Sequence, residues 1–139
     1  MQVSAVVYAL IVIISFLLSF QDIKHKKVNL NLCVMFLLSC VCYGIIKKLS
    51  PCFFPFFIFS TIGILYFLLK KKKAFGAADY FIVFGISFVL DSEYWPCFLI
   101  LCGLIGIIFS LLNKKEKEFP FIPSMLLSFF TVDITKYFI

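Results

Sequence analysis

The sequence has very little charge and no arginine. Of its 139 residues, 13 are basic, all of them lysine, and 7 are acidic. Charged residues make up 14% of the chain, against about 25% in soluble domains, while apolar residues reach 63%. Such a chain cannot cover a water-facing surface. The composition therefore excludes a soluble enzyme, a disordered segment and a nucleic-acid-binding domain, although the net charge is +6.

Paired C-x-x-C motifs are also missing. This excludes a zinc ribbon and a thioredoxin-like redox site. The six cysteines lie in or beside apolar runs, where cysteine commonly acts as a small buried hydrophobic residue. We therefore predict no metal site and no cofactor. The cysteines are Cys33, Cys40, Cys42, Cys52, Cys97 and Cys102.

Long uncharged runs occupy most of the chain. Four runs have 19 to 21 residues, close to the ~20 that cross the hydrocarbon layer as a helix, and two shorter runs are nearly as apolar. Lipid cannot satisfy unpaired backbone groups, so these runs must be helical. The sequence predicts an all-α integral membrane protein, a single domain over residues 1–139 with about six transmembrane helices. The long runs are 1–21, 28–46, 49–69 and 94–113, and the shorter runs are 74–90 and 119–132.

The lysines predict the orientation in the membrane. The first, third and fifth loops hold ten lysines, whereas the second and fourth hold two. By the positive-inside rule the odd-numbered loops are cytoplasmic and the N-terminus lies outside. These lysines would lie near anionic lipid headgroups. The first run has no basic segment before it and no small-residue cleavage site, so it reads as a retained helix and not as a signal peptide.

Two carboxylates remain unexplained by solvation. Ionisable residues at membrane depth are expensive, and each is a functional hypothesis by default. Asp22 directly follows the first run. Asp79 lies six residues after Lys73, inside the shorter run 74–90, so both aspartates fall at the same predicted cytoplasmic interface. Asp133 falls near the outer face, where Lys136 is a suitable partner. The remaining acids lie in loops.

Two carboxyl groups that meet at one membrane face suggest the chemistry of an aspartic peptidase. Two adjacent carboxyls cannot both ionise cheaply, so they share a proton. The ionised group can then take a proton from an attacking water, while the protonated group donates to the carbonyl oxygen of the substrate. A lone Asp22 would otherwise be a solvated helix-end carboxylate, and Asp79 has the weaker structural explanation because its neighbours are apolar.

Three short motifs resemble those of the type IV prepilin peptidases and preflagellin peptidases, which are six-span aspartic proteases of the GxGD type. The first is an aspartate closing the first span and followed by a basic stretch, here residues 22–29. The second is G-x-G-D, here Gly76-Ala77-Ala78-Asp79. The third is P-F-G-P, here Pro120-Phe121-Ile122-Pro123. Order, spacing and sidedness agree over essentially the whole chain.

The sequence departs from the family pattern at four positions. Ala78 replaces the second glycine of G-x-G-D, Phe81 replaces a lysine often found two residues after the aspartate, and Ile122 replaces the glycine of P-F-G-P. The first motif also lacks its proline before Asn29. Larger members carry paired C-x-x-C motifs associated with N-methylation, so the resemblance here implies the minimal form, with peptidase activity alone.

The resemblance implies an aspartic endopeptidase of the inner, cytoplasmic membrane that removes the short basic leader from pilin-like precursors at the cytoplasmic face. Two alternatives are a catalytically degenerate relative that acts as a membrane scaffold, and a small proton- or ion-coupled transporter that uses Asp79. The implied catalytic residues are Asp22 and Asp79, and the implied substrate-binding residues are Gly76, Ala77, Ala78, Pro120 and Pro123.

Overall fold

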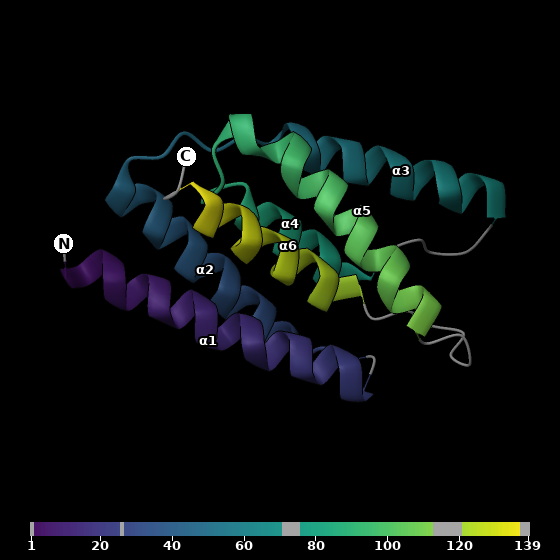
Figure 1. Cartoon of the computed structure of the whole chain (residues 1–139), viewed down its shortest axis with the longest axis horizontal. Coiled ribbons are helices and arrows are strands. Elements are labelled where there is room, and N and C mark those ends of the chain that lie inside the picture. The colour runs from purple at the N-terminus through teal and green to yellow at the C-terminus, as the bar shows by residue number, and fades with distance from the viewer. Residues whose placement is uncertain (1, 26, 71–75, 113–120, 137–139) are drawn as a thin grey trace.

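The computed structural model describes residues 2–25, 27–70, 76–112 and 121–136. Within these residues the chain is helical and contains no strand, which confirms the prediction of an all-α membrane protein (Figure 1). The elements are α1 (Gln2–His25), α2 (Leu30–Lys47), α3 (Phe54–Lys70), α4 (Ala77–Ile86), the short 3-10 helix η1 (Ser92–Tyr94), α5 (Trp95–Leu112) and α6 (Phe121–Thr135).

Local sequence signals explain where several helices begin and end. The Asn29 side chain accepts the N–H of Asn31 at 2.9 Å and caps the start of α2. Lys48, at φ 55°, ends α2 in the left-handed conformation that stops a helix. Pro55 and Pro96 each occupy the second position of a helix, where a missing N–H costs little.

Three of the described helical segments are long and apolar enough to cross a membrane. They are Val3–His25, Leu30–Lys47 and Ser92–Leu112. The other three apolar helices have 10 to 17 residues. The shortest is α4, which covers only part of the predicted run 74–90 because the chain turns after Ile86, where the N–H groups of Phe88 and Val89 bond to carbonyls three residues back.

Successive helices run in opposite directions (Figure 1). The helices α1, α2, α4 and α6 surround the core, while α5 packs outside α6 and α3 packs against α4. The end of α1 therefore lies with the starts of α4 and α6, and we call this the inner end of the bundle. The helix ends that flank the lysine-rich odd loops lie at this end, which agrees with the shared side predicted for those loops.

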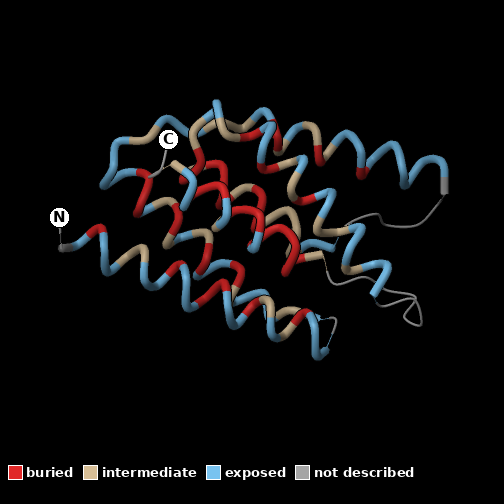
Figure 2. Tube along the Cα trace, viewed as in Figure 1, coloured by how far each residue is buried: buried red, intermediate tan, exposed pale blue. Residues whose placement is uncertain are grey.

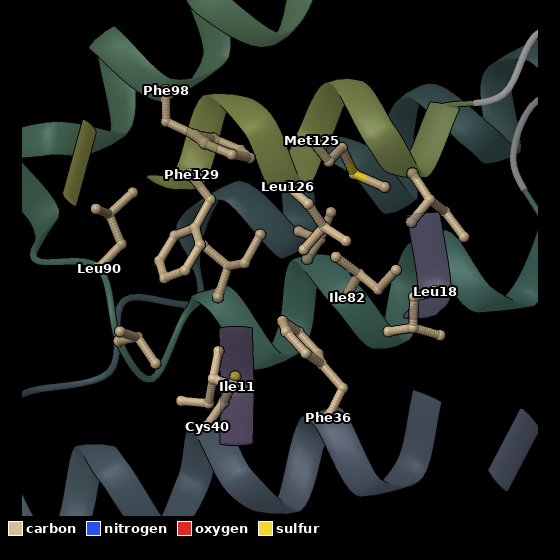
Figure 3. Close-up of a cluster of buried hydrophobic side chains, with 14 of the residues drawn as sticks. Ile11, Leu18, Phe36, Cys40, Ile82, Leu90, Phe98, Met125, Leu126 and Phe129 are labelled. Atoms are coloured by element: carbon tan, nitrogen blue, oxygen red, sulfur yellow. The ribbon is translucent and has the colours of Figure 1, made fainter. Parts of the chain in front are cut away.

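The core lies between these helices (Figure 2). Ile82 of α4 and Met125 and Phe129 of α6 are fully buried there, and Phe36 of α2 faces them (Figure 3). A Cβ added at Gly85 would lie 2.9 Å from the Phe36 ring, so α2 and α4 approach closely at that point. In lipid, such close packing is the main force that holds helices together.

The opposite, outer end carries a polar cluster. Asp133 is 5% exposed, and its carboxylate accepts a hydrogen bond from the Tyr8 hydroxyl. The Lys136 ammonium lies 3.6 Å from Asp133 and 2.9 Å from the carboxylate of Asp91. The predicted ion pair between Asp133 and Lys136 is therefore present, and Lys136 pairs with Asp91 as well. We call these four residues the outer polar cluster.

Candidate active site

Asp22 lies in the last turn of α1 and points into the bundle. Its side chain is nearly buried, and one carboxylate oxygen accepts the backbone N–H of Ile122 at 3.1 Å. Ile122 is the second residue of α6, and the first N–H groups of a helix have no partner within the helix. Asp22 thus caps the start of a helix that lies 100 positions away in the sequence.

Asp79 lies in the first turn of α4. Its carboxylate accepts the backbone N–H of Gly76 at 2.7 Å, three residues back, which is the half of a capping box that an acidic side chain supplies. Gly76 has φ −74° and ψ 161°, an extended conformation that any residue can adopt. A Cβ at Gly76 would lie 3.6 Å from the Asp79 carboxylate, an ordinary contact. The site therefore does not depend on a positive φ at Gly76.

The two carboxylates share one electrostatic environment. Each lies at the N-terminus of a helix, Asp22 at that of α6 and Asp79 at that of α4, where the helix dipole is positive and stabilises negative charge. The structure thus places at one end of the bundle two acids that are 57 positions apart in the sequence.

The residues expected to contact substrate lie beside these acids, with one exception. Ala77 is exposed at the start of α4, whereas Ala78 is half-buried and packs against the core. Pro123 is buried in the first turn of α6. Pro120 lies outside the residues that the structure describes. The third motif is therefore represented here by its last three residues, of which Ile122 contacts Asp22 directly.

Sequence reasoning did not assign a role to Ile122. It was noted only as a departure from the glycine of P-F-G-P, yet its N–H holds Asp22. Because the donor is a backbone group, isoleucine supplies it as well as glycine would. Cys33 of α2 and Cys102 of α5 are buried in the core, as predicted for cysteines that act as small apolar residues. No local pattern marks residues whose only link to the site is tertiary packing.

The described residues offer acid and base groups but no metal site. Among them, no three His, Cys, Asp or Glu side chains lie together as ligands of a metal ion would. A pair of carboxyl groups can instead activate water by exchanging a proton between a donor and an acceptor. This geometry suits hydrolysis of a bond brought to the inner end of the bundle.

Comparison with known proteins decides the family. The model of the type IV leader peptidase family matches residues 9–111, about three quarters of the chain. The chain belongs to the type IV leader peptidase family. It is also 35% identical over 94 residues to a prepilin leader peptidase/N-methyltransferase of Haemophilus influenzae, a match that covers 67% of this chain and 40% of that protein. No solved structure matches the chain.

Family membership bears directly on the site. The matched residues 9–111 contain both Asp22 and Asp79, together with the helix starts and ends that position them. They stop before α6, so the helix that supplies the Ile122 donor lies outside the match. The predicted resemblance to this family is therefore confirmed. As a leader peptidase family member with several apolar helices, the chain is a multi-pass membrane protein.

Proposed function

We propose that this chain is an aspartic endopeptidase that removes the short basic leader from type IV pilin-like precursors. The family supports a peptidase, and the membrane helices support a substrate that is itself anchored in the membrane. Cleavage would fall between the leader and the apolar helix that follows it, at the cytoplasmic face of the inner membrane. Anionic headgroups there would lie near the lysine-rich loops.

One observation carries this proposal. Asp22 and Asp79, from helices distant in the sequence, meet at the same end of the bundle, and each accepts a backbone N–H. In the described residues neither of them pairs with a lysine, so their charges are not neutralised by an ion pair there. Carboxylates at membrane depth are costly, and a catalytic role accounts for two of them at one membrane face.

The chemistry follows from sharing one proton. The ionised carboxylate of the pair takes a proton from a water molecule, whose oxygen attacks the carbonyl carbon of the scissile peptide bond. The protonated carboxyl donates its proton to the carbonyl oxygen as the tetrahedral intermediate forms. Collapse of that intermediate breaks the C–N bond, and the departing amine takes the proton that the first carboxyl removed from water. A hydroxyl of the intermediate returns its proton to the second carboxylate as the new carboxylic acid forms, so the pair ends as it began. The pair titrates as a unit, so either aspartate can begin as the base.

Gly76, Ala77 and Ala78 would lie along the scissile segment, because they precede Asp79 directly and Ala77 is exposed. Pro120 and Pro123 would shape the start of α6 beside it. A transporter is disfavoured by the position of the acids, since coupling carboxylates of transporters commonly lie near the bilayer midplane. Here both acids lie at the inner end.

The decisive experiment is co-expression of the chain with pilin-like precursors from the same genome. Each precursor carries a basic leader followed by an apolar helix, and leader loss is scored by the mass of the product. We expect at least one precursor to lose its leader with the unaltered chain. If none is processed while the chain is present in the membrane, the chain acts as a scaffold and the proposal is wrong.

A further inference from the structure

An apolar groove runs along the outside of the bundle between α1 and α6. It has a volume of about 320 Å³. Its α6 side includes Pro123, Leu127 and Phe130, and Phe109 of α5 closes one end. Phe16 and Leu127 on its walls are 75% and 51% exposed, so the groove opens to the lipid. The lining from α1 consists of Val12, Ser15, Phe16 and Ser19.

The α1 side of the groove suits contact with another helix. Ser15 and Ser19 both line it and are spaced four residues apart, so they lie on the same helix face. Ser15 is 1% exposed and Ser19 is half-buried, so Ser15 lies beneath the surface of the groove and Ser19 is the more accessible of the two. Small residues at this spacing let a second helix approach closely in a membrane, where van der Waals packing and not hydrophobicity drives association. The Ser15 hydroxyl is bonded to the Ile11 carbonyl at 2.6 Å, which leaves a compact surface.

The groove is continuous with the candidate active site. Ser19 comes three residues before Asp22, about 4.5 Å along the helix, and Val12 comes ten residues before it, about 15 Å. On the other side, Pro123 directly follows Ile122, whose N–H bonds Asp22. The groove therefore begins near Asp22 at the inner end of the bundle and extends about two to three helical turns into the membrane.

The other faces near Asp22 are closed. On its second side α1 packs against α2, which in turn approaches α4 closely at Gly85. Phe59 of α3 contacts Phe121 at the start of α6, with ring centroids 6.3 Å apart, and so covers that side. The groove between α1 and α6 therefore offers a helix that enters the membrane below the aspartates an apolar surface that opens to the lipid.

We infer that this groove binds the apolar helix of the precursor, the part that remains after the leader is removed. The inference rests on the proposed function. One ridge of side chains of the substrate helix would lie in the groove, in the manner of ridges-into-grooves packing. The first turns after the scissile bond would run beside Ser19 and then the exposed Phe16 and Val12, so that docking of the helix places the bond at Asp22. A lipid chain or a second copy of the protein would not require continuity with the aspartates.

Two matched substitutions test the groove. Leu127→Trp adds bulk inside it, whereas Leu17→Trp adds the same bulk on a lipid-exposed position of α1, at 45% exposure, that does not line it. The substrates are a processed precursor and a short peptide of the same leader and cleavage site without the apolar helix. We expect Leu127→Trp to lower the ratio of kcat/KM on the precursor to kcat/KM on the peptide by about tenfold, and Leu17→Trp to leave it unchanged.

The outcomes separate this inference from the proposed function. If the unaltered chain cleaves neither substrate, the proposed function fails. If it cleaves both, two results would show that the groove does not bind the substrate helix. One is the same precursor-to-peptide ratio of kcat/KM in the two variants, and the other is an equal loss of kcat/KM on both substrates in Leu127→Trp.

Site-specific photo-crosslinking tests the occupant directly. A photoreactive residue at position 127 or 17 is placed in an Asp79→Asn chain, which retains the precursor uncleaved. We expect the precursor to crosslink at position 127 and not at position 17. Crosslinks at position 127 that contain only lipid or a second copy of the chain would overturn the inference.

Discussion

The two ends of the bundle each hold a pair of aspartates, and among the described residues only the outer pair has a lysine within ion-pair distance. At the outer end, Lys136 lies within 4 Å of both Asp133 and Asp91. At the inner end, Asp22 and Asp79 each accept a backbone N–H and, in the described part of the chain, no lysine. A buried acid with a cation nearby is explained by structure alone. A carboxylate whose contacts are backbone N–H groups at a helix start still has lone pairs that can accept a proton from water.

The same three parts of the chain meet at both ends. The outer polar cluster joins Tyr8 of α1, Asp133 of α6 and Asp91 after α4. The inner end joins Asp22 of α1, the N–H of Ile122 of α6 and Asp79 of α4. Because the same helices meet at both ends, the difference between the ends is whether a lysine lies beside the described aspartates. It predicts that substitutions at the outer end change stability and that substitutions at the inner end change activity.

The largest effect is expected for the acids of the inner end. Asp22→Asn or Asp79→Asn should lower the rate of leader removal by about 10²- to 10⁴-fold, because asparagine can neither accept nor deliver the proton. Processing of a precursor in isolated membranes measures this. The same substitution at the outer end, Asp133→Asn, is the matched control and should leave processing close to that of the unaltered chain. Equal losses in all three variants would remove the contrast between the two ends.

The next largest effect is expected for the cation of the outer polar cluster. Lys136→Met should lower the free energy of unfolding by about 3 kcal/mol, because it leaves the nearly buried Asp133 without its positive partner. Chemical unfolding in detergent micelles, followed by circular dichroism, measures the change. Lys136→Arg keeps the charge and should retain most of the stability. A Met variant as stable as the Arg variant would mean that the ion pair contributes nothing.

A pair of glycine substitutions compares the packing of the two ends. A Cβ at Gly44 of α2 would lie 2.5 Å from the Phe88 carbonyl oxygen, so Gly44→Ala must push two backbone segments apart. We expect a loss of about 2 kcal/mol in unfolding free energy. Gly76→Ala at the inner end makes only an ordinary contact and should change stability by less than about 0.5 kcal/mol. The reverse order would show that the inner end is the more tightly packed.

The smallest effect is expected for the hydroxyl of the outer polar cluster. Tyr8→Phe removes the hydrogen bond to Asp133 but leaves Lys136 in place, so the loss should be about 1.5 kcal/mol. Tyr66→Phe, at a tyrosine of α3 that is 42% exposed, serves as the control. Thermal unfolding of both variants in the same detergent measures the difference. Tyr8→Phe is expected to have less effect than Lys136→Met, and the opposite order would place the stabilising interaction at the hydroxyl.

Much of the fold could be predicted because lipid restricts it. Uncharged runs of about 20 residues must form helices in a membrane, and each described α-helix overlaps one of the predicted runs. Four of them, α1, α2, α3 and α6, extend past the end of their run. The length of α4 could not be predicted, because the turn after Ile86 is made by backbone bonds that apolar composition does not encode. The position of α5 outside α6 was equally inaccessible, since it depends on which apolar faces match.

For the candidate site, the sequence indicated the acids but not their partners. Asp22 and Asp79 stood out because carboxylates are rare at membrane depth, and their common depth followed from the neighbouring lysines. The Ile122 donor could not be found, since a backbone N–H leaves no trace in residue identity. The sequence also could not predict that Ser15 and Ser19 line a groove, because the groove depends on which helix lies beside α1.

The contact between Asp22 and Ile122 also bears on when the protein becomes active during its synthesis. A nascent chain that has inserted α1 and α4 already contains both aspartates, yet the donor that holds Asp22 belongs to α6, which is synthesised after both of them. The wall of the groove formed by α6 is made at the same stage. On the proposed function, we expect leader removal to begin only after α6 has entered the membrane.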